Sequence, residues 1–314
     1  MSEAMSLPVI DRERPRRRLP PWLKRPMPTA EMLKTRELIN GLKLNTVCVE
    51  ARCPNLTECW SRGTATFMVL GDECTRRCGF CAVSTKKPRP PDDGEPQRMA
   101  EAAAQLGLRH VVITSVARDD LPDEGAGHFS RCIAATRARL PQATIEVLVP
   151  DFHARPELIE IVVAARPEVY NHNIETVARL QKMVRPAARY ERSLQVLERV
   201  KRQDARVHTK SGIMVGLGES HDELVQTMRD LRAAGCELLT IGQYLQPGER
   251  YLPVERFYPP EDFEQLGRIA EELGFHAVAS GPFVRSSYFA ETLFAETDSI
   301  AGFVRGERGH GSGG

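Results

Sequence analysis

The amino-acid sequence predicts an α/β fold, in which six strand–helix units form a partial (β/α)6 barrel flanked by an N-terminal and a C-terminal extension. Three observations indicate it. Short β-branched runs recur along the 314 residues, helix-like stretches separate them, and polar residues follow several runs directly. Alternating strands and helices form a parallel sheet through right-handed crossovers. In a TIM-type barrel the residues after the strands share one mouth, where we expect the chemistry.

The chain begins with a basic, proline-rich arm, which we assign to residues 1–28. Its stretch 11–28 carries seven Arg or Lys residues, two acids and five prolines. Such a segment can dock on an acidic partner or can be a solvated, extended arm, and both interpretations stay open. Residues 29–65 form a predicted N-terminal extension. It should open with a helix at 30–44, where Met32, Leu38 and Leu42 recur at helical spacing.

The barrel itself is predicted to span residues 66–275. Its six strands are expected at 66–70, 110–116, 144–149, 168–171, 207–215 and 238–243. Its helices are expected at 95–106, 127–139, 155–165, 190–203 and 221–234. A seventh strand-like run at 276–279 opens a C-terminal extension, 276–295. Residues 296–314 are polar and glycine-rich, which is typical of a disordered tail.

Composition and charge argue against several classes of protein. No stretch approaches the run of about 20 apolar residues that a membrane helix needs. The N-terminus lacks the apolar core of a signal peptide, which favours a cytoplasmic location. The net charge of +1 gives the molecule no field that would attract nucleic acid or anionic lipid. We therefore expect a protein that binds neither nucleic acid nor membrane.

Six of the eight cysteines lie in two groups of three. Cytosolic thiols are kept reduced, so the groups indicate metal binding rather than disulfides. Cys74, Cys78 and Cys81 form C-x3-C-x2-C directly after the first predicted strand. A structural zinc site usually takes four protein ligands, whereas a four-iron cluster on three thiolates keeps one iron open for a reactant. The spacing therefore favours chemistry at the metal.

The other group, Cys48, Cys53 and Cys59, forms C-x4-C-x5-C before the barrel begins. It indicates a second cluster, again one protein ligand short. A small zinc knot or buried free cysteines are the alternatives that the spacing leaves open. Cys132 and Cys236 lie in or beside helical stretches, and we interpret them as small buried residues.

Two motifs resemble those of the radical S-adenosylmethionine (SAM) enzymes. The loop CTRRCGFC matches in cysteine spacing, in Phe80 and in its place after the first strand. The run SGIMVGLGE, residues 211–219, resembles the strand that packs on the adenine of SAM. The resemblance implies that Cys74, Cys78 and Cys81 hold a 4Fe-4S cluster whose open iron binds SAM. One electron from the cluster would then yield methionine and a 5'-deoxyadenosyl radical.

The chain is more specifically similar to the lipoyl synthase family, and the similarity extends from Trp22 to Ala290. It covers TVCVEARCPNLTECW, GTATFMVLGDECTRRCGFCAV, TSVARDDLPDEGAGHF, VYNHNIETV, KSGIMVGLGE, TIGQYLQP and VRSSY. The resemblance implies that Cys48, Cys53 and Cys59 hold an auxiliary 4Fe-4S cluster completed by a serine of RSSY. Ser286 and Ser287 are the candidates, and we favour Ser287. A hydroxyl is a poor ligand beside thiolates, so its iron should be released most easily.

In this family the auxiliary cluster is the sulfur donor. The resemblance implies insertion of two sulfur atoms, at C6 and C8 of an octanoyl group on a lipoyl carrier domain, with two SAM molecules cleaved per lipoyl group. The implied partners are octanoylated E2 subunits of 2-oxoacid dehydrogenases, the glycine cleavage H protein, a ferredoxin or flavodoxin-type reductant, and an iron-sulfur carrier for cluster repair. Other functions remain open: a sulfur-inserting methylthiotransferase that acts on tRNA, or a zinc or ferredoxin-like binding protein without catalysis.

Candidate SAM-binding residues share a place on the cluster loop or near a predicted strand end at the barrel mouth. They are Phe80, Ser115, Asn173, Glu175, Met214, Gly216, Glu219 and Gln243. Glu175 and Glu219 could equally cap helices, because a carboxylate in a first helical turn is common. For His172 we predict a hydrogen-bonded position at a strand end, since removal of a hydrogen atom by a radical needs neither an acid nor a base.

Overall fold

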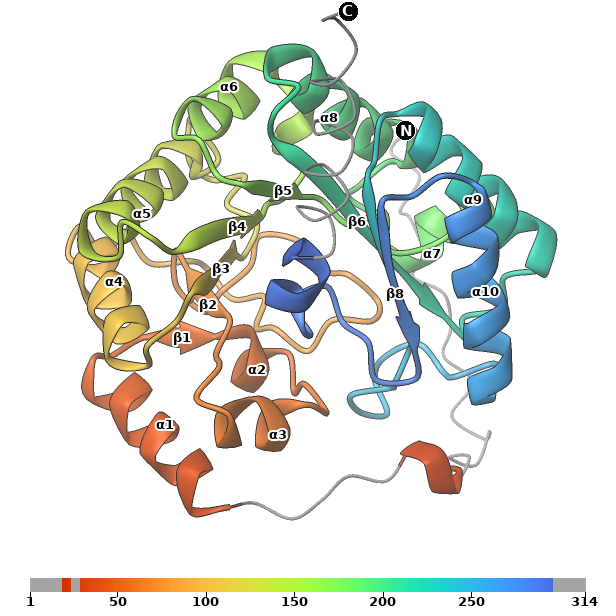
Figure 1. Ribbon diagram of the computed structural model, residues 1–314, viewed down its shortest axis with the longest axis horizontal. Helices are drawn as coiled ribbons and strands as arrows, with labels where there is room; N and C mark the ends of the chain where they lie inside the picture. Colours follow the sequence, from red (N-terminus) through yellow and green to blue (C-terminus); the bar gives the residue numbers. More distant parts are fainter. Residues whose placement is uncertain (1–18, 24–28, 296–314) are drawn as a thin grey trace, which may run out of the picture.

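The computed structural model describes residues 19–23 and 29–295. Its eight strands form one sheet in the order of the sequence, which curls into an open barrel (Figure 1). β2 to β8 pair in parallel, and β1 pairs antiparallel with β2. The sheet ends at β1 and β8, so the barrel is incomplete. The predicted partial barrel is therefore confirmed.

The strands have the following bounds: β1 Asn45–Thr46, β2 Phe67–Val69, β3 His110–Ser115, β4 Thr144–Leu148, β5 Val169–Asn171, β6 His208–Val215, β7 Leu238–Gln243 and β8 Ala277–Gly281. The six predicted strands and the seventh strand-like run are all present, with ends that differ by at most two residues. β1 was not predicted, because two residues are too short to show a period.

The helices have these bounds: α1 Ala30–Gly41, α2 Val47–Glu50, α3 Leu56–Ser61, α4 Glu95–Gln105, α5 Ala126–Arg139, α6 Pro156–Ala164, α7 Gln181–Val184, α8 Tyr190–Gln203, α9 His221–Ala233 and α10 Pro260–Glu272. Short 3-10 helices occupy Pro21–Leu23, Phe152–Ala154 and Ala178–Leu180. α4, α5, α6, α8, α9 and α10 surround the sheet (Figure 1).

The sequence expectations did not include α10, although its signals are present. Pro260 occupies the first turn, where a missing N–H costs nothing, and Phe263, Leu266 and Ala270 are buried at helical spacing. α2 and α3 were also missed, because they lie among the cysteines and are too short for a hydrophobic period.

Two large apolar clusters hold the strands against the helices. One joins β2 to β4 with α4, α5 and α6 and includes the buried Phe67 and Phe129. The other joins β6 and β7 with α8, α9 and α10 and includes Leu239, Met228 and Phe263. A fully buried side chain of this size stabilises the fold by about 1.5–3 kcal/mol. The clusters thus make the strand ends a rigid support for the loops that follow them.

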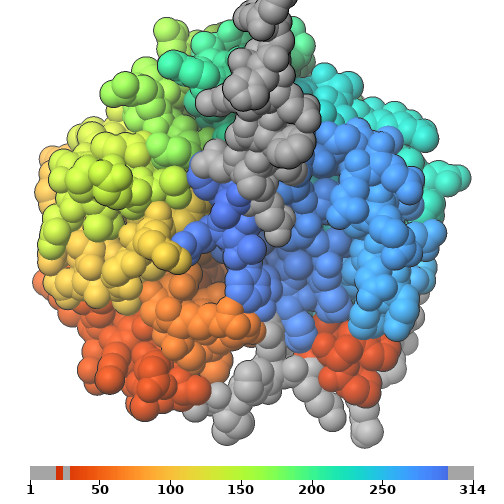
Figure 2. All heavy atoms as spheres, viewed as in Figure 1, coloured from red at the N-terminus to blue at the C-terminus, as the bar shows by residue number. Residues whose placement is uncertain are grey.

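After β8 the chain crosses the centre of the ring, as the blue segment of Figures 1 and 2 shows. We call residues 282–295 the C-terminal strap. Its residues 290–295 are helical, and Leu293 and Phe294 are buried. The Phe294 ring centroid lies 5.8 Å from the ring centroids of both His110 and His208, which begin β3 and β6. The strap therefore covers the end of the barrel where these strands start.

Two of the sequence-based expectations concern parts of the chain outside the described residues. These are the tail at 296–314 and, apart from residues 19–23, most of the arm at 1–28. Within residues 19–23 and 29–295, no helix combines the length and the apolar character that crossing a membrane requires.

Candidate functional site

The loop of Cys74, Cys78 and Cys81 follows β2 and is tied to the barrel at several points. The Cys74 N–H donates to Ser84 O at 2.7 Å, and the Gly79 N–H donates to Val184 O at 2.9 Å. Gly79 O in turn accepts from the Leu252 N–H at 3.0 Å. A Cβ on Gly79 would lie 2.8 Å from a Leu252 methyl carbon, so glycine lets this loop approach its neighbour closely.

The chemistry of these thiols fits a shared metal centre. Burial raises the pKa of Cys78 to about 11 and that of Cys81 to about 12. The neighbouring Cys74 also raises both pKa values, while Arg185 lowers the pKa of Cys78. None of the eight cysteines, all within the described residues, forms a disulfide. Thiols held this way release protons when they coordinate a metal.

The other group of cysteines lies in the N-terminal extension. Cys48 is on α2, Cys59 is on α3, and the Cys53 N–H between them donates to Cys48 O at 3.0 Å. Burial, and next the neighbouring Cys53, raise the pKa of Cys48 to about 11. Within the extension, α1 supports α3, because Thr35 Oγ1 donates to Trp60 O at 2.8 Å. The three thiols therefore sit on one short, supported segment.

The C-terminal strap is joined to this segment by three hydrogen bonds. Asn55 Nδ2 donates to Phe283 O at 2.7 Å, and the Tyr288 hydroxyl donates to Glu58 Oε1 at 2.9 Å. The third joins the hydroxyls of Thr66 and Ser287 at 2.8 Å. The partners in these bonds are separated by 221 to 230 residues of sequence. The fold thus brings the RSSY motif to the Cys48, Cys53 and Cys59 group.

The two candidate serines face different neighbours. Ser287 bonds to Thr66, whose backbone N–H is also hydrogen-bonded to the Cys48 thiol. Ser286 instead makes hydrogen bonds of 2.6 and 2.9 Å with the side-chain amide of Asn173, which follows β5. The two contacts favour Ser287 as the residue that accompanies the N-terminal cysteines, and place Ser286 at the barrel interior.

Gly242 on β7 allows the strap to pass. A Cβ there would collide with the carbonyl oxygen of Val284 and lie 3.1 Å from Arg285 Nη1. We expect Gly242→Ala to displace the strap, which carries Ser287, and to lower the free energy of unfolding by about 1–3 kcal/mol. Thermal denaturation measures the loss of stability, and hydrogen exchange of peptides that cover residues 282–295 measures the displacement.

Gly267→Ala is the matched control for that change. A Cβ on Gly267, within α10, would make an ordinary contact of 3.4 Å with Ser280 Cβ. Alanine is also the better helix former, so this variant should be as stable as the parent or slightly more stable. Equal behaviour of the two glycine variants would contradict the close passage of the strap.

Several predicted SAM-binding residues gather at the mouth. Asn173 Nδ2 donates to Glu175 Oε1 at 3.0 Å, and burial raises the pKa of Glu175 despite Arg185 nearby. The Ser115 hydroxyl, at the end of β3, is buried and has no hydrogen-bond partner among the described residues. A buried hydroxyl without a partner is costly unless a ligand satisfies it, so this position fits a polar cofactor. Met214 is half-buried on β6 beside them.

The side chains of Glu219 and Gln243 are instead hydrogen-bonded to backbone groups. Glu219 accepts from the N–H groups of Gly216 and Leu217 at 2.6 and 2.9 Å. Gln243 Nε2 donates to the carbonyls of Val215, Tyr244 and Arg256, while its Oε1 accepts from the Tyr258 N–H. Both side chains therefore shape the loop after β6. Direct contact with a cofactor, which we predicted for both, stays a prediction that these bonds do not test.

Gly216 and Phe80 also have clear structural surroundings. Gly216 has a φ of +105°, and a Cβ would meet the Gln243 side chain and the Arg256 carbonyl, so only glycine suits this turn. Phe80 packs against the apolar cluster around β6 and β7. His172 is hydrogen-bonded directly after β5, as predicted: its Nδ1 lies 2.9 Å from Val149 O and its Nε2 lies 3.0 Å from Ser193 Oγ. The side chain is also buried.

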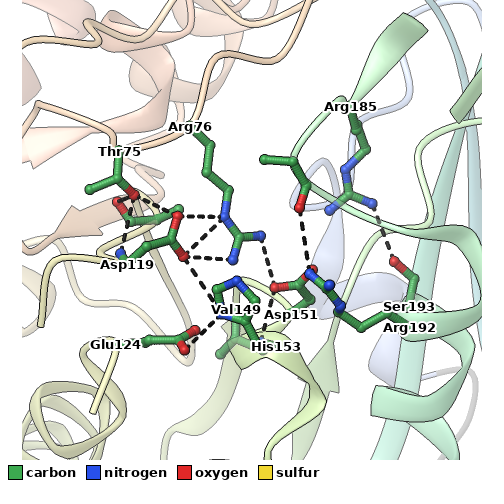
Figure 3. A network of polar contacts seen from close by, with 12 residues as sticks. Thr75, Arg76, Asp119, Glu124, Val149, Asp151, His153, Arg185, Arg192 and Ser193 are labelled. Carbon is green, nitrogen blue, oxygen red and sulfur yellow. Dashed lines mark hydrogen bonds and ion pairs between the residues drawn. The ribbon is translucent and has the colours of Figure 1, made fainter. Parts of the chain in front are cut away.

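Residues that were absent from the predicted site form a network of polar contacts with Thr75 and Arg76 of the cluster loop (Figure 3). Arg76, between Cys74 and Cys78, is ion-paired with Asp119 and Asp151. Arg185 donates to the carbonyls of Asn173 and Ile174. In the sequence, only the arginines of CTRRC and the polar residues that follow the strands could have indicated this network.

The carboxylates of Asp119 and Glu124 and the His153 ring bring three possible metal-ligand atoms within 4.8 Å of one another. However, Arg76 is paired with Asp119, and Arg155 lies 3.5 Å from Glu124. These guanidinium groups already balance the carboxylates, so we interpret the cluster as an ion-pair network.

Comparisons with known proteins agree with this site. The model of the radical SAM superfamily matches residues 68–231, and the model of the N-terminal domain of lipoyl synthase matches residues 5–53. The fold is similar to HydG, a maturase of the FeFe-hydrogenase, with a TM-score of 0.54, 12% identity, and coverage of 67% of this chain and 50% of that chain. It is also similar to Streptococcus suis SuiB bound to S-adenosylmethionine, with a TM-score of 0.51, 12% identity, and coverage of 69% and 50%.

Curated relatives are much more similar in sequence. The lipoyl synthase of Rhodopirellula baltica is 55% identical over 284 residues, which cover 90% of this chain and 89% of the relative. The lipoyl synthase of Rubrobacter xylanophilus is 53% identical over 279 residues, which cover 88% and 87%. Sequence identity at this level over nearly the full length shows to which family the chain belongs. The chain belongs to the lipoyl synthase family, within the radical SAM superfamily.

Proposed function

We propose that this chain inserts two sulfur atoms, at C6 and C8 of an octanoyl group on a lipoyl carrier domain, and so makes the lipoyl cofactor. The observation that carries the proposal is the C-terminal strap, which reaches from the N-terminal cysteine group to Asn173. Asn173 is bonded to Glu175, a charged neighbour of Cys78 and Cys81. Ser287 bonds to Thr66 beside Cys48, and the adjacent Ser286 bonds to Asn173 at the barrel interior. A substrate inside the barrel could therefore reach both groups. Membership of the lipoyl synthase family argues against the two alternatives, a tRNA methylthiotransferase and a non-catalytic zinc or ferredoxin-like protein.

The residues divide into two ligand sets. Cys74, Cys78 and Cys81 would hold the 4Fe-4S cluster that, with SAM, supplies a 5'-deoxyadenosyl radical. This chemistry suits C6 and C8, which are methylene and methyl carbons without an acidic proton. Cys48, Cys53, Cys59 and Ser287 would hold the auxiliary 4Fe-4S cluster, which is consumed as the sulfur donor and is thus a substrate.

The chain's own side chains would bind and orient SAM at the mouth. We assign direct contacts to Ser115, Asn173, Glu175 and Met214, and close backbone approach to Gly216. Glu219, Gln243 and Phe80 would act indirectly, because they hold the loop after β6 and the cluster loop in place. Precise placement of a radical next to its target carbon matters because misplacement by about 1 Å can cost 10²-fold in rate.

We assign the partners from the reaction. The carrier would be an octanoylated E2 subunit of a 2-oxoacid dehydrogenase or the glycine cleavage H protein. A ferredoxin or flavodoxin-type protein would supply the electron for each of the two SAM molecules cleaved. An iron-sulfur carrier would rebuild the auxiliary cluster after each turnover, because the reaction removes its sulfur.

The test is an assay of the anaerobically purified and reconstituted chain. Two full clusters correspond to about eight irons per chain. With SAM, a reductant and an octanoylated carrier domain, mass spectrometry should show a product with two added sulfur atoms. Zinc in place of iron, or two intact clusters without any sulfur-containing product, would refute the proposal.

The choice between the two serines gives a sharper prediction. Ser287→Ala should remove the fourth ligand of the auxiliary cluster and abolish lipoyl product, while SAM cleavage continues. Ser286→Ala is matched in chemistry and adjacent in sequence, and it should retain the Mössbauer signal of the auxiliary cluster. The reverse result, with the auxiliary cluster lost only in Ser286→Ala, would assign the ligand to Ser286.

A further inference from the structure

Arg76 is the buried side chain of the cluster loop. Its Nε and Nη2 donate to both oxygens of Asp119, at 2.6 to 3.1 Å, and its Nη1 lies 2.8 Å from Asp151 Oδ1 (Figure 3). The Arg76 side chain is 6% exposed and that of Asp151 is 0% exposed. Asp119 follows β3 and Asp151 follows β4. One guanidinium thus connects the loop to two strand ends.

The charge on Asp151 is secured by a second cation. Arg192, on α8, lies 3.2 Å from the other oxygen of Asp151. Burial by itself would raise the pKa of Asp151, but Arg76, His172 and hydrogen bonds outweigh burial and lower it to about 2. Asp151 therefore remains a carboxylate at neutral pH and holds Arg76 from within the fold.

Thr75 adds a second attachment at the same place. Its N–H donates to Ala117 O at 3.1 Å, and its Oγ1 accepts from the Asp119 N–H at 3.1 Å. The Arg76 N–H also points to Cys74 Sγ at 3.4 Å. The two residues that directly follow Cys74 are thus fixed to the barrel, and one of them contacts the thiol.

We propose that Arg76 is a positioning residue which, through Asp119 and Asp151, presets the arrangement of Cys74, Cys78 and Cys81 before the cluster binds. A loop that is already ordered loses less conformational freedom when its three thiolates bind one cluster, so it binds the cluster more tightly. The planar guanidinium is suited to this role because it pairs with one carboxylate through two bonds and still reaches another. The proposal rests on the proposed role of these cysteines as cluster ligands.

The loop supplies its own control in Arg77. This neighbour carries the same charge, but it is exposed. Arg76→Gln and Arg77→Gln therefore remove the same charge from adjacent positions, and only the first breaks the clamp. Asp151→Asn breaks the clamp from the other side, with almost no change in shape. Asp151→Asn removes a negative charge near the loop, whereas Arg76→Gln removes a positive one.

The experiment begins with the metal-free chain. Hydrogen exchange of peptides covering residues 74–81 should become about tenfold faster in Arg76→Gln and in Asp151→Asn, and should be unchanged in Arg77→Gln. Arg76→Lys keeps the charge without the fork and should be intermediate. Equal exchange in the Arg76→Gln and Arg77→Gln chains would overturn the proposal. If Arg76→Gln does not fold, Arg76→Lys and Asp151→Asn decide the outcome in the same way.

The reconstituted chain provides an independent readout. Iron at Cys74, Cys78 and Cys81 should be released to a chelator faster in both clamp variants. The reduction potential of that cluster should fall in Arg76→Gln and rise in Asp151→Asn, because the two changes alter the local charge oppositely, and a general folding defect would not give opposite shifts. Iron release from both clamp variants at the same rate as from the Arg77→Gln chain would overturn the clamp. Lack of sulfur insertion in the parent chain would refute the proposed function but leave these results standing.

Discussion

Replacing Cys74, Cys78 and Cys81 together by alanine should abolish both SAM cleavage and lipoyl product. Replacing Cys48, Cys53 and Cys59 together should abolish only the product. The reason is the division of labour between the groups: one would support the radical, and the other would hold the sulfur that the radical chemistry consumes. Each triple variant should bind about four irons, half the full complement. Measurement of 5'-deoxyadenosine together with mass spectrometry of the carrier separates the two activities.

Cys132→Ala is the matched control for these changes. Cys132 is fully buried in α5 and belongs to neither group, and burial raises the pKa of its thiol. Its removal should leave both iron content and product formation intact, at a small cost in stability. Lipoyl product from either triple variant, or loss of SAM cleavage in the Cys48, Cys53 and Cys59 variant, would contradict the assignment.

Most of the barrel could be predicted because strand and helix periods are local. The runs that became β3, β4, β6 and β7 are β-branched and buried, so composition alone identifies them. The order of the strands follows from right-handed crossovers. β1, α2 and α3 escaped prediction because their positions depend on contacts with the rest of the fold rather than on a repeating pattern.

The site was predictable only in part, for a physical reason. Cysteine spacing shows which thiols share a centre, since the ligands are close in sequence. The bond between Thr66 and Ser287 joins residues 221 apart, and no periodic pattern in the sequence predicts it. The resemblance to a family suggested only that Ser287 accompanies the N-terminal cysteines. Likewise Glu219 and Arg76 have side chains of the kind that bind ligands. Their actual partners, a backbone turn and two buried carboxylates, appear only in three dimensions.

A buried ion pair inside the barrel should have the largest effect on stability. Lys210 Nζ lies 2.9 Å from both oxygens of Glu146, and both side chains are 1% exposed. Asn171 also donates to Glu146 at 2.9 Å, and His110 Nε2 lies 3.4 Å away. Burial alone would raise the pKa of Glu146, but Lys210 and His110 hold it well below its usual range. The carboxylate is therefore charged, and it depends on Lys210.

Lys210→Met should lower the free energy of unfolding by about 3–5 kcal/mol, because it leaves a charged carboxylate buried without its partner. Adding Glu146→Leu should recover much of that loss, since a well-packed apolar pair often replaces a buried ion pair at little cost. Arg206→Met, which breaks the surface pair with Asp204, should lower the free energy of unfolding far less than Lys210→Met does. Urea denaturation of the metal-free chains measures all three.

The pH dependence provides the decisive check on this pair. Because the pKa of Glu146 is depressed in the folded state, its stabilisation is fully present above the ordinary value of 4.5 and is lost as the pH falls from there through the folded value of about 2. In Lys210→Met the depressing charge is gone, burial dominates, and the folded chain takes up a proton at Glu146 instead. The stability difference between parent and variant should therefore be largest near pH 7 and smaller near pH 4. A difference that stays constant across this range would show that packing of the lysine stem, rather than its charge, stabilises the barrel.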